Sequence, residues 1–568
     1  MKRFVITIVI AFFVIFGFYV RFYRFPSHPE LHVDEMSFGY SSYSWIKTGV
    51  DEHGNPPGLL LTSLGDQKLA LYGYFVTPFV FLFGLEPLAV RLPSALFAIG
   101  TVFVMYLLTL RLTRDRLSAL LSALVLWILP WHVIFSRTAN EVTMELFFLI
   151  GGVWVFLKYI DSGRLRWLFL SCVLFLLSLL SYYPAFVTVP LITFLLGVVY
   201  VSRERRLVLV PFVVCSVTLA LFLLTQSTDR ISQITFIGHE SQISLLFERR
   251  TEAGMAGAPI LLTRVVHNIY TVAALDHFSL RFLFVDGEVV DARYDVPYHG
   301  PIYFALLPFL MTGLCLSILK TEIEWREKII ILSWIVIAFV PGAMTTESTS
   351  LQRSFLAING FVILISVGLA YGINQISSLK KRIRLLIVGF SVAVTLASFV
   401  YYSYSLFVHY PFRRPWGRDG HVEEMLVKVR AHEKRYKKVY ISKPPYISMF
   451  FFDKSDPDWA RKTVGHNLEK NGAFFYLSKF GDYFGMPVDC PRKGKRNILF
   501  VCKGAYVPYR SRVIDVVRFK DEVPAYVLIE FTTDDGYDFN NKGFRIVNMD
   551  NNLDRQSVLD DDHQTDWE

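Results

Sequence analysis

The amino-acid sequence predicts a mostly α-helical protein that crosses a membrane many times and carries a C-terminal α/β domain. Of its 568 residues, 53% are hydrophobic and 19% are charged, whereas a typical soluble domain is about 45–50% apolar and about 25% charged. The apolar excess lies in residues 1–402, where long apolar runs alternate with short polar links. Residues 403–568 have the composition of a soluble domain. We therefore predict a membrane domain at 1–402 and a separate domain at 403–568.

Eleven apolar runs approach the length of about 20 residues with which an α-helix crosses a bilayer. They lie at about 4–21, 88–110, 117–135, 142–160, 167–181, 185–202, 207–225, 301–319, 329–343, 355–373 and 385–402. A further run at 69–84 is interrupted by Pro78 and predicts a juxtamembrane or re-entrant helix. No small-x-small cleavage site follows the first run, which predicts an uncleaved helix rather than a signal peptide.

The links between these runs predict the orientation of the chain. Lys and Arg gather in alternate short links, as they do in cytoplasmic loops. These cations are Lys2, Arg3, Arg111, Arg114, Arg116, Lys158, Arg164, Arg166, Arg203, Arg205, Arg206, Lys320, Arg326, Lys328, Lys380, Lys381, Arg382 and Arg384. We expect a multi-pass protein of the cell membrane with a cytoplasmic N-terminus, and an odd number of spans then places the C-terminal domain outside. This bias accounts for the net charge of +9. The sequence contains no basic helix with base-reading residues, so it does not predict nucleic-acid binding.

The outer side also carries two long loops, at about 22–87 and 226–300. In the C-terminal domain, DGHVEEMLVKVRAHEKRY has helical periodicity, and KKVYIS, RNILFVC, SRVIDVVRF and YVLIEF predict strands. The final stretch, DNNLDRQSVLDDDHQTDWE, is polar and acidic and predicts a disordered tail.

The five cysteines divide into two groups. Cys172, Cys215 and Cys315 lie within apolar runs and predict small core residues. Cys490 and Cys502 flank PRKGKRNILFV in the C-terminal domain. They form a disulfide if that domain is extracytoplasmic, or they are two unrelated thiols; sequence alone leaves both interpretations open.

Two adjacent carboxylates, Asp34 and Glu35, lie in the segment LHVDEMSFGY, shortly after the first apolar run. One interpretation is that Asp34 caps the helix that SFGYSSYSWI predicts. His32 beside them allows a metal site, but HxDE is an incomplete ligand set. The other interpretation is a pair of functional carboxylates at the outer membrane surface.

Three cations accompany these carboxylates on the predicted outer side: Lys68, Arg137 and Arg353. Phosphate is the natural partner of such cations near headgroup depth. Ordinary snorkelling to the interface is the alternative for each of them.

Several segments, taken together, resemble one enzyme family. They are LHVDE, TGVDEHG, GDQKLALYGYFVTP, FGLEPLAVRLPSALFAIGTVFVMYLLTLRL, FSRTANEVTMELFFLIGGVWVFL, DGEVVDARYDVPYHGPIYFALLPFLMTGL and PGAMTTESTSLQRSFLAINGFVILISVGLA. These resemble the glycosyltransferase family 39 branch of the GT-C superfamily, which includes protein O-mannosyltransferases and bacterial aminoarabinose transferases. The resemblance covers roughly residues 1–402 and implies a GT-C type fold.

The resemblance implies transfer of a sugar from a polyprenyl- or dolichyl-phosphate carrier to an acceptor hydroxyl on the outer face, with inversion. Asp34 matches the family's catalytic acidic residue, and Glu35 its neighbour. Lys68 falls where some members bind the carrier phosphate, although Gln67-Lys68-Leu69 lacks the prolines common there. Arg137 and Arg353 match basic positions more loosely.

This assignment is chemically consistent. A positioned carboxylate that removes the acceptor's proton typically contributes about 10²–10⁴-fold, the role expected of Asp34. The departing phosphate needs cationic stabilisation rather than a general acid, which Lys68, Arg137 and Arg353 would supply. No cofactor is required: some distant GT-C relatives use a divalent metal with an Asp-x-Asp pattern, which the first loop lacks.

Other classes of protein fit part of the sequence. A transporter or lipid flippase explains the many spans, although transporters usually place functional charges near the bilayer midplane. A membrane scaffold and a GT-C ligase that moves a whole glycan are further alternatives. The sugar is not readable, and the acceptor is a protein, a lipid or a glycan. In the second long loop, His239, Glu240, Asp276 and His277 are expected to cover the site rather than line it.

Overall fold

The structure is a computed structural model that describes residues 2–63, 66–202, 206–225, 275–288, 293–319, 323–344, 349–413, 415–471, 474–532 and 544–547. The chain forms two compact units that interleave along the sequence. The first contains Met1–Pro29, Lys68–Phe75 and Arg91–Tyr410, and the second contains Glu30–Gln67, Val76–Val90 and Pro411–Glu568. Part of the first long loop therefore belongs to the same unit as the C-terminal sequence. The predicted boundary between residues 402 and 403 stays a prediction.

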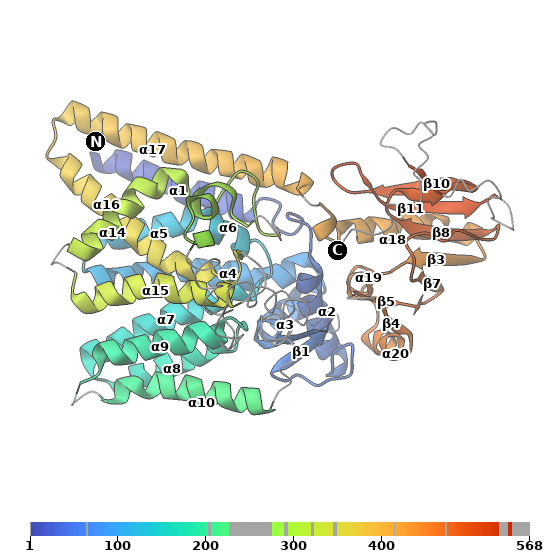
Figure 1. The fold of residues 1–568 in the computed structure, drawn as a ribbon, viewed down its shortest axis with the longest axis horizontal. Coiled ribbons are helices and arrows are strands. Elements are labelled where there is room, and N and C mark those ends of the chain that lie inside the picture. Colours follow the sequence, from blue (N-terminus) through green and yellow to red (C-terminus); the bar gives the residue numbers. More distant parts are fainter. Residues whose placement is uncertain are drawn as a thin grey trace, which may run out of the picture. The chain divides into compact units, whose positions relative to one another are not determined.

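The first unit is a bundle of apolar helices (Figure 1). Every predicted run coincides with a helix or a pair of helices. The helices are α1 (Lys2–Phe22), α4 (Pro87–Thr113), α5 (Arg116–Ile128), α6 (Pro130–Ser136), α7 (Glu141–Ser162), α8 (Leu165–Leu179), α9 (Ala185–Tyr200), α10 (Val210–Thr225), α14 (Leu307–Leu319), α15 (Trp325–Ala343), α16 (Ile358–Ser377) and α17 (Lys381–Tyr404). The interrupted run forms α3 (Leu71–Phe83), whose residues from Val76 onward, Pro78 included, belong to the second unit.

Several of these helices are long and apolar enough to cross a membrane. Within the described residues, five meet both conditions: Pro87–Thr113, Glu141–Ser162, Arg206–Thr225, Phe355–Ile376 and Lys381–Phe412. The pair α5 and α6, bent by 57°, makes a sixth if it is one broken span. The chain therefore has the features of a membrane protein, while the count of eleven spans stays a prediction.

Small residues bring two of these helices close together. A Cβ atom added to Gly313 in α14 would lie 1.8 Å from the carbonyl oxygen of Leu364 in α16, and one added to Gly368 would lie 2.0 Å from the Phe309 oxygen. Small residues allow such backbone approaches between apolar helices. Cys315 is off this packed face and is exposed, so its predicted core position is wrong, whereas Cys172 and Cys215 are buried as predicted.

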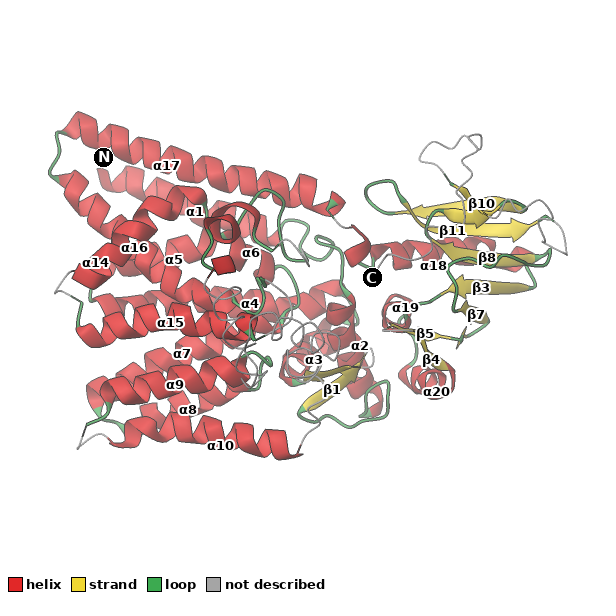
Figure 2. Ribbon diagram, in the orientation of Figure 1, coloured by secondary structure: helices red, strands yellow, loops and turns green. Residues whose placement is uncertain are grey.

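The second unit contains a six-stranded mixed sheet, drawn in yellow in Figure 2, with strand order β10-β11-β8-β3-β7-β6. Central β3 runs parallel to β7 and β8, and β11 runs antiparallel to β8 and β10. The strands are β3 (Lys438–Ser442), β6 (Lys479–Phe480), β7 (Tyr483–Met486), β8 (Ile498–Lys503), β10 (Ser511–Arg518) and β11 (Pro524–Phe531). The four predicted strands correspond to β3, β8, β10 and β11.

Helices and smaller strand pairs complete this unit. The predicted helix is α18 (Gly420–His432), and it contacts β10 and β11. The other elements are α2 (Val33–Thr48), β1 (Leu60–Ser63), β2 (Asp66–Leu69), α19 (Tyr446–Asp453), α20 (Pro457–Asn467), β4 (Leu468–Asn471), β5 (Phe474–Leu477), β9 (Tyr506–Pro508) and β12 (Phe544–Ile546). Helix α19 packs against both α2 and α18, so the first loop and the C-terminal sequence share one packing core in this unit.

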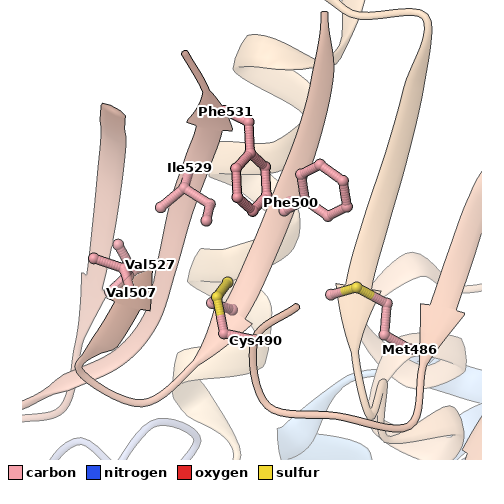
Figure 3. Packing of buried hydrophobic residues seen from close by; sticks show 8 residues of the cluster. Met486, Cys490, Phe500, Val507, Val527, Ile529 and Phe531 are labelled. Atoms are coloured by element: carbon pink, nitrogen blue, oxygen red, sulfur yellow. A yellow bond between two sulfur atoms is a disulfide. The ribbon is translucent and has the colours of Figure 1, made fainter. Parts of the chain in front are cut away.

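A disulfide joins Cys490 to Cys502 within the apolar cluster of the sheet (Figure 3). Phe500, Val527 and Phe531 pack around it. The structure thus selects the disulfide from the two interpretations that the sequence leaves open. The predicted acidic tail at 550–568 lies outside the described residues.

Candidate functional site

The two adjacent carboxylates lie in the first turn of α2, where the chain forms a capping box. His32 is the N-cap: its Nδ1 accepts a hydrogen bond from the backbone N–H of Asp34 at 3.1 Å. Glu35 closes the box, because its Oε1 accepts from the backbone N–H of His32 at 3.2 Å. This reciprocal bonding satisfies two of the donors that a helix start leaves without intrahelical partners. The helix cap is therefore His32, and the interpretation of Asp34 as the cap is wrong.

The environments of the two carboxylates differ. The side chain of Glu35 is 1% exposed, and its Oε1 lies 3.4 Å from a terminal nitrogen of Arg418. The side chain of Asp34 is 36% exposed, and its Oδ2 lies 3.2 Å from Nδ1 of His32. That second contact is an ion pair only when His32 is protonated, since a neutral Nδ1 accepts from the Asp34 N–H instead. Glu35 is therefore built into the helix start, whereas Asp34 is accessible to a reactant.

A third carboxylate, that of Asp419, interacts electrostatically with Asp34. Burial raises the pKa of Asp419 to about 7, with smaller contributions in the same direction from Asp34 and Glu30, against Lys503 and Arg418, which lower it. The backbone N–H of Asp419 donates to the Leu31 oxygen at 2.9 Å. Neither Arg418 nor Asp419 is among the site residues that the sequence predicts. The local signal is that Asp419 and Gly420 begin the predicted C-terminal helix.

The second motif of the loop, TGVDEHG, includes the C-terminal end of α2 and the turn that follows it. Gly49 ends the helix in the left-handed conformation, with φ of 76°, which glycine adopts without strain. Asp51 Oδ1 accepts from the backbone N–H groups of His53 and Asn55 at 2.9 and 2.8 Å. These bonds hold the turn that follows the helix in one conformation.

The next residue of the motif, Glu52, is fully buried and accepts from the hydroxyl of Ser41 in α2 at 3.0 Å. Burial, followed by the neighbouring Asp51 carboxylate, raises the pKa of Glu52 to about 7. The motif therefore anchors the loop to α2 through a carboxyl group that is costly to ionise.

The predicted cations belong to the first unit. Among them, Arg137 is buried and hydrogen-bonded to the backbone. It is fully buried at the end of α6. Its terminal nitrogens donate to the carbonyl oxygens of Val20, Arg21, Tyr23 and His28, the last three at 2.7, 2.9 and 2.7 Å. Carbonyls at a helix end lack intrahelical donors, so Arg137 closes the C-terminal end of α1. Its predicted role as a phosphate ligand stays a prediction.

The links that carry the three cations are joined by a hydrogen-bond network. Tyr72, one turn after Lys68, shares a 2.8 Å hydrogen bond with the hydroxyl of Ser94. That hydroxyl donates at 3.1 Å to the carbonyl of Asn140, in the link that follows Arg137. The side chain of Gln352, next to Arg353, donates at 3.3 Å to Asn140 Oδ1. Lys68 and Arg353 are both partly exposed, so they remain the accessible members of the predicted set.

Part of the second long loop packs on the link that contains Arg353. The buried His277 accepts from the backbone N–H of Ser350 at 3.5 Å, and the buried Glu288 accepts from that of Leu351 at 3.4 Å. The expectation that Asp276 and His277 cover the site rather than line it stays a prediction. His239 and Glu240 lie outside the described residues.

Among the residues that the structure describes, no three His, Cys, Asp or Glu side chains are grouped to hold a metal ion. The expectation that the site needs no cofactor stays a prediction.

Part of the chain is similar to a known family and to parts of two known proteins. Residues 70–226 match the family model described as dolichyl-phosphate-mannose-protein mannosyltransferase. The chain is 36% identical over 87 residues to "Putative mannosyltransferase YkcB" and 32% identical over 133 residues to "Putative mannosyltransferase YycA", both of Bacillus subtilis (strain 168). These matches cover 15% and 23% of this chain but only 12% and 19% of the two relatives. The predicted resemblance to these mannosyltransferases is confirmed.

Two solved structures are similar over a larger share of the chain. ArnT from Cupriavidus metallidurans bound to undecaprenyl phosphate is 14% identical, with a TM-score of 0.48, over 91% of this chain and 97% of that one. AglB from Archaeoglobus fulgidus, in complex with an inhibitory peptide and a dolichol-phosphate, is 10% identical, with a TM-score of 0.46, over 79% of this chain and 63% of that one. At such TM-scores neither likeness carries a conclusion about the activity of this chain.

Proposed function

We propose that the chain is a membrane glycosyltransferase that moves a sugar from a polyprenyl-phosphate carrier to an acceptor hydroxyl on the outer face of the membrane. The observation that carries the proposal is the contrast in the first turn of α2. Glu35 is buried and bonded, whereas Asp34, one residue earlier, is accessible beside it. The family match of residues 70–226 supports the reaction class.

In the proposed reaction, Asp34 accepts the proton of the acceptor hydroxyl as the oxygen attacks the anomeric carbon. The bond between that carbon and the phosphate oxygen breaks, and the carrier leaves as polyprenyl phosphate. Attack from the face opposite the leaving group inverts the anomeric centre. A carboxylate base of this kind typically contributes about 10²–10⁴-fold.

The leaving phosphate gains negative charge as the bond breaks, and cations that meet it there lower the barrier. We assign this role to Lys68 and Arg353, which are partly exposed in the first unit. Arg137 contributes by holding the end of α1, from which the chain continues toward residues 30–35. The proposed donor is a polyprenyl-phosphate-linked sugar, and the acceptor is a protein, a lipid or a glycan.

An extracytoplasmic location of the second unit is part of the proposal. The Cys490–Cys502 disulfide supports it, because disulfides persist in oxidising compartments. The cytoplasmic N-terminus follows from the distribution of Lys and Arg along the chain.

The transporter alternative has less support. Transporters usually place their binding sites near the bilayer midplane. Glu145 is a buried carboxyl within α7, but it lies one turn from the N-terminal end of that helix rather than in its middle.

The test is release of radiolabelled mannose from mannosyl-phosphoryl-undecaprenol by purified protein in detergent, with water in place of the acceptor hydroxyl. Asp34→Asn is compared with wild type and with Asp458→Asn, an exposed acid of α20 in the same unit. Loss of turnover in Asp34→Asn alone, with lipid binding kept, supports the proposal. Equal turnover in all three proteins removes Asp34 from the mechanism.

A further inference from the structure

A short C-terminal segment lies against the carboxylate-bearing loop of the second unit. This segment is Arg418-Asp419-Gly420, referred to below as the RDG segment. The backbone N–H of Asp419 donates to the Leu31 oxygen at 2.9 Å. A Cβ atom added to Gly420 would lie 2.5 Å from the carboxyl group of Glu30, so the backbone at Gly420 is in close contact with the Glu30 side chain. Residues almost 400 positions apart in sequence therefore form one local structure.

Arg418 extends this contact to the helix start of α2. A terminal nitrogen of its guanidinium lies 3.4 Å from Glu35 Oε1 and 3.4 Å from the backbone oxygen of Glu30. The side chain of Arg418 is only 10% exposed. The same Oε1 atom of Glu35 accepts the capping-box hydrogen bond from the His32 N–H. One carboxylate oxygen thus joins the cap of α2 to the RDG segment.

The charges make this link more than a packing contact. Glu35 is buried, and a buried carboxylate without a cationic partner is strongly destabilising. Arg418 supplies that cation from the C-terminal side of the chain. Removing this cation would loosen Glu35 and so weaken its bond to the His32 N–H.

We propose that Arg418 is a positioning residue for Asp34: it fixes Glu35, which fixes the capping box and with it the first turn of α2. The C-terminal sequence is then a structural component of the site rather than a separate appendage. This inference rests on the proposed function, in which Asp34 is the base. A catalytic group displaced by about 1 Å can cost about 100-fold in rate, so the link has a direct kinetic consequence.

The experiment uses the full-length protein and the mannosyl-phosphoryl-undecaprenol probe. Arg418→Gln is compared with Arg418→Lys, with the double variant Glu35→Gln/Arg418→Gln, and with the control Arg461→Gln. Arg461 also pairs with an acid of the same unit, Asp458, at 2.7 Å, but on the surface of α20.

We expect kcat of Arg418→Gln to fall about 10- to 100-fold, while the KM for the donor changes less than twofold. Arg418→Lys should recover part of kcat because it keeps the charge. The double variant should be no worse than Arg418→Gln, since it leaves no buried carboxylate without a cation. Wild-type kcat in Arg418→Gln would overturn the positioning role.

Hydrogen–deuterium exchange of the peptide that covers residues 31–40 tests the same link without turnover. We expect faster exchange at the helix start in Arg418→Gln and wild-type exchange in Arg461→Gln. Unchanged exchange in Arg418→Gln would contradict the inference even if the probe is not a substrate. If Arg418→Gln does not fold, Arg418→Lys and the double variant give the same comparison.

The two proposals fail in different ways. Full turnover by Asp34→Asn would remove Asp34 from the proposed mechanism, and exchange at the helix start would still decide whether Arg418 holds α2. Lost turnover by Asp34→Asn together with normal turnover by Arg418→Gln would reject only the inference about Arg418.

Discussion

The first turn of α2 and the end of α1 are both rich in charge, but they use it differently. At the end of α1, the terminal nitrogens of Arg137 are bonded to four backbone carbonyl oxygens, and the side chain is fully buried. At the start of α2, Glu35 has the comparable structural role and Asp34 remains more than a third exposed. A charged residue near a predicted site is thus a candidate for chemistry only when its bonding atoms are accessible.

The comparison is tested most severely at Arg137. Replacing it by Gln leaves several buried carbonyl oxygens without donors, each costing about 1–3 kcal/mol. We expect the variant to lose roughly 3 kcal/mol or more of stability, measured as thermal unfolding in detergent. Retained stability with a raised donor KM would instead make Arg137 a phosphate ligand.

Glu52 tests whether the buried carboxyl of the second motif is structural. Its pKa of about 7 in the folded protein exceeds the ordinary value of 4.5, so the folded state holds the proton more tightly than the unfolded state. Wild type therefore loses stability as pH rises from about 4.5 to about 7, and Glu52→Gln lacks this loss. We expect the variant to be more stable by roughly 2–3 kcal/mol at pH 8.5 and by little at pH 5.

Thermal unfolding across this pH range measures the difference. The control is Glu424→Gln, an exposed acid of α18, which should follow the wild-type curve. A Glu52→Gln curve parallel to that of wild type would show that folding does not shift the pKa of Glu52.

Arg353 is partly exposed, whereas Arg137 is fully buried, so the two arginines test opposite predictions. Its replacement by Gln should raise the donor KM about tenfold and leave thermal stability close to wild type, because its side chain is partly exposed. Arg512→Gln, which removes an exposed cation from β10, should change neither quantity. An unchanged KM in Arg353→Gln would leave Lys68 as the proposed phosphate ligand.

Asp419 gives the smallest expected effect. Its charge and that of Asp34 repel one another. Because Asp419 is mostly protonated below its pKa of about 7, Asp419→Asn should leave kcat unchanged at about pH 6 and change it only above about pH 7, where the substitution removes a negative charge near Asp34. An effect of Asp419→Asn on kcat that is as large at about pH 6 as at about pH 8 would show that the Asp419 carboxyl does not titrate near pH 7.

Much of the fold is predictable from sequence because its signals are local. Apolar runs of near-membrane length coincide with helices, and β3, β8, β10 and β11 follow short apolar segments of strand type. The role of Asp34 as an accessible acid next to a helix start is also a local feature. The short strand β7, with four residues, offers too little pattern to predict.

The rest depends on long-range contacts that no local pattern encodes. Arg418 and Glu35 are 383 positions apart, and Arg137 meets the end of α1 more than 100 positions earlier. The positive charge of Arg137 predicted phosphate binding, whereas its structural bonding depends on which carbonyls the fold brings to it. Cys315 shows the same limit, since an apolar run does not reveal which face of a helix is packed.

The most direct measurement of the central contrast compares Asp34→Asn with Glu35→Gln at equal concentrations of folded protein. We predict that Asp34→Asn loses about 10²–10⁴-fold in kcat and unfolds at the wild-type temperature. Glu35→Gln should unfold at a lower temperature, because it removes the buried charge that pairs with Arg418. Wild-type kcat in Asp34→Asn would contradict the account, whatever the behaviour of Glu35→Gln.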